Sequence, residues 1–223
     1  MKKLFASPIL VAVFAVVLGV GSTGCFKDRV VGSGTIVTEN RIMNGDFKEI
    51  RIECSANILV KQGDSIRVSV KDYANIIPYL QTKIVGNALV IDYDKNAWIS
   101  NSAGEVTVTL PKLTNVELTG SGDVGTIGNF RFDDLSLIIS GSGNFSFAGV
   151  CKNLNAKVSG SGDIRAFDLP TEVANVRISG SGNMQLNVSR TLDATISGSG
   201  DIIYKGNPSV STNITGSGRV RKF

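Results

Sequence analysis

The sequence contains no histidine, one tryptophan, three cysteines and five prolines among 223 residues. The absence of histidine removes the commonest general base and the commonest metal ligand. No run of lysine or arginine alternates with aromatic residues, so the usual footprint of a nucleic-acid-binding protein is missing. Two of the four net positive charges come from Lys2 and Lys3 at the very start of the chain. We therefore expect no catalytic residue, no cofactor and no nucleic-acid partner.

Residues 1–24 have the features of a secretory signal peptide. Two lysines precede an almost unbroken apolar run from Leu4 to Val20, and four small residues lead to Cys25. The segment Gly21-Ser22-Thr23-Gly24-Cys25 resembles the lipobox of bacterial lipoproteins, although Ser22 stands where that family usually has leucine. The resemblance implies that Cys25 carries a lipid anchor to the membrane of the cell envelope, expected to be the outer membrane, at its periplasmic or its surface face. The alternative is an ordinary cleaved signal with an incidental cysteine.

Two further cysteines, Cys54 and Cys151, belong to the mature chain. An exported compartment would permit a disulfide between them. Cys54 continues the alternation of Ile50 and Ile52, which favours a buried thiol. Pairing needs α-carbons within about 7 Å, so the sequence leaves this question open.

The mature chain divides by pattern into three parts. Residues 25–35 are short, polar and glycine-containing, which is typical of a tether. Residues 36–111 show short alternating stretches without a clear repeat, and residues 112–223 repeat regularly. The first of these two parts is expected to contain a single helical turn between Tyr73 and Leu80 and five strands, over 47–53, 57–61, 65–71, 88–93 and 105–110.

A Gly-Ser-Gly tetrad returns six times, with first glycines 21, 19, 20, 18 and 18 residues apart. A fixed period of about 20 residues is the signature of stacked structural repeats. The fourth position alternates between aspartate and asparagine until the last copy, which has Arg219. The predicted turn residues are Gly120, Gly122, Asp123, Gly141, Gly143, Asn144, Gly160, Gly162, Asp163, Gly180, Gly182, Asn183, Gly198, Gly200, Asp201, Gly216 and Gly218.

Apolar columns accompany the tetrads. Alternation of apolar and polar residues predicts strands with one buried face before and after each tetrad. The column two residues before each first glycine is apolar throughout, and the column four residues before is mostly apolar; they hold Leu118, Ile139, Val158, Ile178, Ile196 and Ile214, and Val116, Leu137, Ala156, Val176, Ala194 and Thr212.

Since one repeat cannot bury its apolar face alone, stacking of equivalent strands is required. The sequence predicts an all-β fold, a parallel β-helix or β-solenoid with coils of about 18–21 residues and an irregular N-terminal β cap. A propeller needs blades of about 40 residues, and an antiparallel sandwich would not explain the recurring corner.

The column Asp123, Asn144, Asp163, Asn183, Asp201 also suggests calcium. Calcium takes six to eight oxygen ligands, and the known repeat sites use a nine-residue period, about half of this one. A structural column, with Asp and Asn fixing turns, accounts better for the pattern, and calcium stays the alternative.

One adjacent acidic pair, Asp133 and Asp134, is the strongest candidate for the catalytic carboxylates of an enzyme. Two carboxylates support glycoside hydrolysis only when they face each other across a groove, which neighbours in sequence seldom do. A polysaccharide-active enzyme is therefore the least favoured functional class.

Several segments before the tetrads complete a family pattern. With the tetrads, they resemble the putative auto-transporter adhesin head GIN domain family, exported proteins common in Bacteroidetes. The resemblance spans roughly residues 37–221 and implies a β-helical exported domain without assigned catalytic or binding residues. Its supporting segments are 47–50 (FKEI), 58–64 (ILVKQGD), 75–80 (NIIPYL), 88–91 (ALVI) and 106–111 (VTVTLP).

The functional expectation combines the anchor with the regular domain. We expect a non-enzymatic, adhesin-like lipoprotein of the cell envelope that presents its polar columns to glycans or to other surface macromolecules. A periplasmic scaffold protein that binds an envelope partner is the alternative. The sequence leaves the ligand and the oligomeric state open.

Overall fold

The computed structural model describes residues 28–223, and its regular elements are β-strands apart from one 3₁₀ turn. The N-terminal elements are β1 (Asp28–Val31), β2 (Ile36–Arg41), β3 (Glu49–Ile52), β4 (Asn57–Gln62), β5 (Arg67–Tyr73), η1 (Ile77–Tyr79), β6 (Leu80–Val85), β7 (Ala88–Tyr93), β8 (Ala97–Ser100) and β9 (Glu105–Leu110). The remaining strands are β10 (Asn115–Leu118), β11 (Val124–Ile127), β12 (Phe130–Ile139), β13 (Phe145–Ser146), β14 (Gly149–Val158), β15 (Ile164–Ile178), β16 (Met184–Ile196), β17 (Ile202–Lys205), β18 (Ser209–Ile214) and β19 (Val220–Lys222).

All five strands expected between residues 36 and 110 are confirmed, as β3, β4, β5, β7 and β9. The single helical turn expected near Pro78 is confirmed as η1, in which the proline occupies the first turn. Proline is tolerated there because the first amide groups of a helix have no partner within the helix. Local pattern was therefore sufficient to place these elements.

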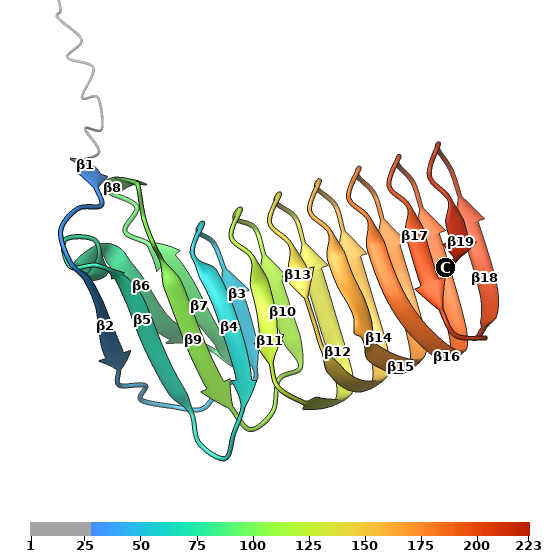
Figure 1. Ribbon diagram of the computed structural model, residues 1–223, viewed down its shortest axis with the longest axis horizontal. Coiled ribbons are helices and arrows are strands. Elements are labelled where there is room, and N and C mark those ends of the chain that lie inside the picture. The colour runs from blue at the N-terminus through green and yellow to red at the C-terminus, as the bar shows by residue number, and fades with distance from the viewer. Residues whose placement is uncertain (1–27) are drawn as a thin grey trace, which may run out of the picture.

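From β10 onward, each strand pairs in parallel with the strand one repeat away. Val116 pairs with Leu137, and Leu137 pairs with Ala156. The strands that follow the tetrads stack in the same way, as the pairing of Val124 with Phe145 shows. Figure 1 shows the result: two facing layers of strands, joined along one edge by narrow turns. Stacked repeats thus supply one another with backbone hydrogen-bond partners.

The core lies between the two layers. Leu137, Ala156 and Ala194 from the predicted inward columns have no exposed surface. Phe130 and Phe132 stack with ring centroids 4.6 Å apart at the start of β12, and both are buried. Burial of a large apolar side chain stabilises a fold by about 1.5–3 kcal/mol. The sum over this continuous core holds the two layers together.

The N-terminal strands pair differently. β5 pairs in antiparallel register with β2 and with β9, and β6 with β7. The turn at Gly86-Asn87 permits the last of these hairpins, because Gly86 has a φ of +62°. The same region also contains parallel pairs, β3 with β7 and β4 with β9. Since β3 pairs with β10 and β4 with β11, the sheet continues without a break into the repeats.

The expected fold, a parallel β-helix with an irregular N-terminal cap, is therefore wrong. Seventeen strands form one sheet with mixed pairing, which curls around the core into a nearly closed barrel. The antiparallel strands are members of this sheet. The prediction failed because alternation of apolar residues shows which face of a strand is buried but carries no information on strand direction.

The signal peptide predicted for residues 1–24 and the lipid attachment predicted at Cys25 lie outside the described residues. Part of the expected tether is described: Asp28–Val31 forms β1, which pairs in parallel with β8. This two-stranded sheet lies beside the N-terminal end of the large sheet (Figure 1). Among residues 28–223, no helix has the length and apolar character needed to cross a membrane.

Candidate functional site

The tetrads lie at the corners where the chain passes from one layer to the other (Figure 1). Their fourth residues form a hydrogen-bonded column through successive repeats. Asn144 donates its backbone N–H and its side-chain N–H to Oδ1 of Asp123, at 3.1 and 2.9 Å. The backbone N–H of Asp163 in turn donates to Oδ1 of Asn144, at 3.0 Å. Each side-chain oxygen therefore fixes the corner of the next repeat.

The column extends further than the sequence indicated. The backbone N–H of Asp123 donates to Oδ1 of Asn57, at 3.0 Å, so the column begins before the first tetrad. At its other end, the backbone N–H of Arg219 donates to Oδ1 of Asp201, at 2.8 Å. Asn57 was missed because no Gly-Ser-Gly sequence accompanies it.

The tetrad glycines are required by close approach of stacked backbones. A Cβ atom on Gly162 would lie 1.9 Å from the carbonyl oxygen of Gly143, and one on Gly122 would lie 2.0 Å from that of Ala56. The backbone angles at these corners are seldom special to glycine, because among the tetrad glycines only Gly216 has a positive φ, +141°. Glycine is required at these corners mainly because there is no room for a Cβ atom, and less because of an unusual backbone conformation.

The Asp/Asn column provides few free oxygen ligands for a calcium ion. Oδ1 of Asp123, Asn144, Asp163, Asn183 and Asp201 already accepts an N–H from the next repeat. Asp163 Oδ2 also contacts the Arg165 guanidinium at 3.3 Å. Within residues 28–223, no group of three or more acidic, cysteine or histidine side chains is arranged to hold a metal ion. The observed hydrogen bonds thus already engage the Oδ1 atom of every residue in the column.

Asp133 and Asp134 do not face each other across a groove. Asp133 forms an exposed ion pair with Lys112, at 3.3 Å, and Asp134 accepts a hydrogen bond from Asn153, at 2.9 Å. The two carboxylates also line separate hollows. Their arrangement gives no support to a glycosidase site, which requires two cooperating carboxyl groups.

Cys54 and Cys151 are free and buried. Burial raises the pKa of the Cys54 thiol to about 11 and that of Cys151 to about 12. Because the thiolate is the reactive form, neither cysteine has the character of a nucleophile or a metal ligand at neutral pH.

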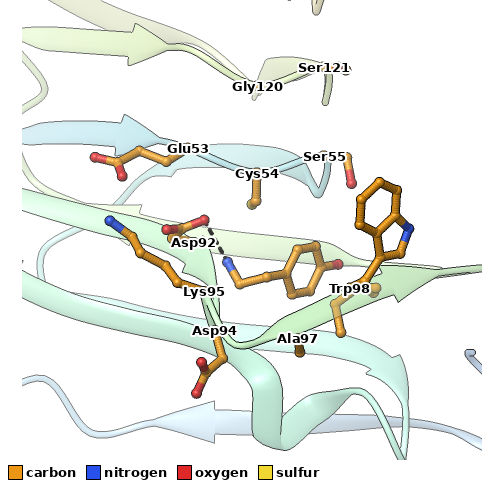
Figure 2. Close-up of a pocket in the computed structure, with 12 residues that line it drawn as sticks. Glu53, Cys54, Ser55, Asp92, Asp94, Lys95, Ala97, Trp98, Gly120 and Ser121 are labelled. Atoms are coloured by element: carbon orange, nitrogen blue, oxygen red, sulfur yellow. Dashed lines mark hydrogen bonds between the residues drawn. The ribbon is translucent and has the colours of Figure 1, made fainter. Parts of the chain in front are cut away.

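A pocket of about 400 Å³ opens at the N-terminal end of the molecule. The segment that follows β3, the end of β7, the β7–β8 connection, β8 and the first tetrad contribute its walls. Figure 2 shows Trp98 at one side of this pocket, with the carboxylates of Glu53 and Asp92 toward the other. Asp94 and Lys95 complete the charged part of the lining. Three carboxylates and one ammonium group make the pocket acidic.

Trp98 is the one tryptophan of the chain, and two-thirds of its side chain is exposed. The turn before β8 fixes its position. Oδ1 of Asp94 accepts the backbone N–H of Asn96 at 2.9 Å, and the carbonyl oxygen of Asp94 accepts that of Ala97 at 3.0 Å. β1 then supports β8 from the other side, with Arg29 in register with Trp98. The backbone at Trp98 is thus fixed, and its indole is largely uncovered.

A buried polar network includes Tyr93, one of the residues that line the pocket. Asp72 is fully buried, and its Oδ2 accepts the Ser102 hydroxyl at 2.7 Å. Its Oδ1 accepts the backbone N–H of Ala103 at 2.9 Å and that of Tyr73 at 2.7 Å. The hydroxyls of Ser102 and Tyr93, a lining residue, lie 2.6 Å apart. A buried carboxylate that is satisfied in this way rigidifies its surroundings.

Burial also shifts the titration of two lining residues. It raises the pKa of Asp92, while the hydrogen bond from the Tyr93 backbone N–H, at 2.8 Å, opposes the shift. Burial likewise raises the pKa of Tyr93, against the effect of its hydrogen bond with Ser102. The Tyr93 hydroxyl therefore stays protonated at neutral pH, and the Asp92 carboxyl group loses its charge at a higher pH than an ordinary aspartate.

Sequence reasoning missed this pocket. It directed attention to the polar columns of the repeats, whereas Glu53, Asp92 and Trp98 come from segments with no repeat. The available signal was the lone tryptophan between the polar stretches 94–96 and 100–102. Only the tertiary structure brings it beside residues more than 40 positions earlier in the chain.

Solved structures of similar fold are known. A putative adhesin from Bacteroides fragilis is 23% identical, with a TM-score of 0.75, over 87% of this chain and 100% of that chain. A putative adhesin from Parabacteroides merdae is 22% identical, with a TM-score of 0.57, over 88% and 99%. A putative lipid binding protein from Parabacteroides distasonis is 24% identical, with a TM-score of 0.60, over 88% and 100%. At these identities the likeness shows a shared fold.

No curated protein matches the chain. The sequence pattern of a known family matches residues 46–208, which is well over half of the chain. The match includes β3, β4, every strand of the repeats up to β17, and the residues that line the Trp98 pocket. The chain therefore belongs to the putative auto-transporter adhesin, head GIN domain family.

Proposed function

We propose that this protein is an exported, non-enzymatic adhesin of the cell envelope, lipid-anchored at Cys25, and that it binds glycans in the Trp98 pocket. The exposure of Trp98 beside an acidic pocket is the observation that carries the proposal. Family membership supports an adhesive function. The anchor rests on the sequence around Cys25.

The chemistry of the pocket suits a sugar. An exposed indole offers a flat apolar face on which the C–H face of a sugar ring can lie. The carboxylates of Glu53 and Asp92 accept hydrogen bonds from hydroxyl groups, and the Tyr93 hydroxyl can donate or accept. Since carboxylates outnumber cationic groups, the pocket favours neutral sugars or amino sugars over uronic or sialic acids.

Parts of the pocket lining are held in a fixed geometry. The turn at Asp94 fixes the backbone before Trp98, and the Tyr93 hydroxyl is held through Ser102 and Asp72. A preorganised site avoids the entropic cost of ordering side chains on binding. Affinity can therefore come from a small number of contacts.

Glycan binding by the mature chain tests the proposal. We expect a neutral oligosaccharide to bind in an array and in titration calorimetry, and Trp98→Ala to weaken binding by about thirtyfold, as for loss of an aromatic anchor. Ile42→Ala, which removes another exposed apolar side chain outside the pocket, is the matched control and should bind normally. Equal binding by the Trp98 variant, or binding of acidic glycans alone, would contradict the site.

Cell experiments test the location. We expect Cys25→Ser to release the protein from the membrane fraction. Protease added to intact cells should remove the domain from the surface. Full protection of the domain would favour the periplasmic scaffold function over the adhesin.

A further inference from the structure

The ribbon formed by β1 and β8 presents one exposed face. Successive side chains of a strand point to opposite faces, and partners in register share a face. Arg29 is in register with Trp98, so both side chains lie on the same face as Val31. Val31 is 46% exposed and Trp98 66%, and Arg29 is exposed too, whereas Val30 and Ile99 of the opposite face are partly buried. We call Arg29, Val31 and Trp98 the ribbon face.

Hydrogen bonds tie the ribbon to the body of the molecule. The side-chain N–H of Asn75 donates to the carbonyl oxygen of Val31, at 2.8 Å. Asn101 likewise donates its side-chain N–H to the carbonyl oxygen of Gly32, at 2.7 Å. The ribbon face therefore has a fixed place beside the Trp98 pocket, to whose lining Trp98 itself belongs.

The ribbon begins close to the proposed lipid anchor. Two residues separate Cys25 from Asp28, the first residue of β1. Three peptide steps span at most about 11 Å in any conformation. Adding the step to Arg29 and the spacing of two paired strands places the α-carbon of Trp98 within about 20 Å of that of Cys25. An anchor at Cys25 would thus hold this end of the molecule, and not the last repeats, at the membrane (Figure 1).

The chemistry of this end suits a membrane surface that carries sugars. Tryptophan is enriched at membrane interfaces because its ring is amphipathic. Val31 adds apolar surface, and the Arg29 guanidinium can donate hydrogen bonds to lipid phosphates. The pocket itself is acidic and therefore disfavours an anionic headgroup. A neutral sugar headgroup avoids this repulsion and offers hydroxyl groups to the carboxylates.

We propose that the glycan of the Trp98 pocket is the neutral sugar headgroup of a glycolipid, and that the ribbon face rests on the membrane that carries this lipid. The inference rests on the proposed function, both for sugar binding and for the anchor at Cys25. A sugar that belongs to the same membrane meets an anchored pocket at high effective concentration. A small number of contacts in the pocket is then sufficient.

Vesicle binding by the mature chain with Cys25→Ser tests the proposal, because this variant has no lipid of its own. The probe is a neutral disaccharide that binds in the glycan array, used free and as its ceramide conjugate in phosphatidylcholine vesicles. We expect the vesicles to bind at least about tenfold more tightly than the free disaccharide. Vesicles of phosphatidylcholine alone, or with phosphatidylglycerol, should bind more weakly.

The fluorescence of Trp98 reports the contact directly, since the chain has one tryptophan. Its emission should shift to shorter wavelength on the glycolipid vesicles. Phospholipids brominated near the headgroup should quench it. Binding of these vesicles without quenching would place the ribbon face away from the membrane and would overturn the proposal.

Variants separate the ribbon face from the pocket. Val31→Glu lies outside the pocket lining, so it should keep its affinity for the free disaccharide and lose the advantage on vesicles. Trp98→Ala should lose both. Ile127→Glu, which places the same charge on a similarly exposed apolar position of β11, is the matched control and should bind like the parent.

The outcomes also distinguish this inference from the proposed function. Equal affinity for the free and the membrane-borne disaccharide, or a Val31 variant that keeps the vesicle advantage, would overturn the inference and leave the glycan site intact. Loss of binding to neither form in Trp98→Ala would refute the glycan site and the inference together. Equally tight binding to vesicles without glycolipid would assign the ribbon face to the bilayer itself and would overturn the inference.

Discussion

Asp163 accepts two hydrogen bonds from Asn183 of the next repeat, one from the backbone N–H at 2.9 Å and one from the side-chain N–H at 3.1 Å. The same oxygen atom thus fixes both the backbone and the side chain of the following corner. Because this relationship recurs along the column, each repeat determines the geometry of the next one.

Asp163→Ala should destabilise the domain by about 1–2 kcal/mol, because it leaves these two donors without their partner in a partly exposed setting. Asp163→Asn should cost less, since the amide oxygen can still accept, as Asn144 does elsewhere in the column. Urea denaturation of both variants would measure the difference. Equal losses for alanine and asparagine would show that the column contributes charge and not hydrogen bonds. If EDTA alone lowered the melting temperature of the parent by many degrees, the column would instead bind calcium.

Gly162→Ala should destabilise the fold by about 3 kcal/mol, because the new methyl group would overlap the carbonyl oxygen of Gly143 and force stacked backbones apart. Gly125→Ala is the matched control. Its Cβ would lie 3.4 Å from the nearest atom, the Ser146 carbonyl oxygen, and its φ is not positive. Thermal unfolding of the two variants should therefore differ clearly. A Gly162 variant as stable as the Gly125 variant would contradict the close-approach explanation.

Asp92→Asn should raise the melting temperature at pH 7 and leave it unchanged near pH 3. Burial raises the pKa of Asp92 in the folded state, so the protonated form is favoured more in the folded protein than in the unfolded chain. The stability associated with that protonated form is complete below the unfolded pKa, about 3.9, and is lost as the pH rises through the folded value. Asparagine has no charge to lose, so the two proteins should diverge as the pH rises. A constant gap at all pH values would rule out this titration as the cause.

Acidification should also weaken glycan binding in the Trp98 pocket. The raised pKa of Asp92 means that it loses its charge at a higher pH than an ordinary aspartate, and a protonated carboxyl group is a poorer acceptor. Calorimetric titrations at several pH values would show the decline. Asp92→Asn should bind more weakly at neutral pH and lose part of this pH dependence. An unchanged pH profile in that variant would place the titrating group elsewhere.

Cys54 and Cys151 should resist thiol reagents at pH 8 in the folded protein and react fully in denaturant. Burial raises the pKa of both thiols and also blocks access to them. A colorimetric thiol assay on a Cys25→Ser protein would count them. Fast reaction of either thiol without denaturant would show that the core opens locally around that residue.

The sequence predicted much of the local structure correctly. The strand over 57–61 was expected from alternation and is β4, and the inward positions of Leu137 and Ala156 were expected from their columns. These features depend on neighbours within a few residues, so their pattern is visible in the chain. The pairing direction of β5 and β6 was not visible, because an apolar face looks the same in parallel and antiparallel strands.

The sequence alone determined the repeat period, the corners and the alternation that divides core from surface. Each of these follows from local backbone geometry and from the side chains within one repeat. Only the tertiary structure decided how the N-terminal strands join the sheet, that Trp98 lies beside Glu53 and Asp92, and that β1 pairs with β8. Such juxtapositions depend on which distant segments share backbone hydrogen bonds, and that choice is made by the packing of the whole core.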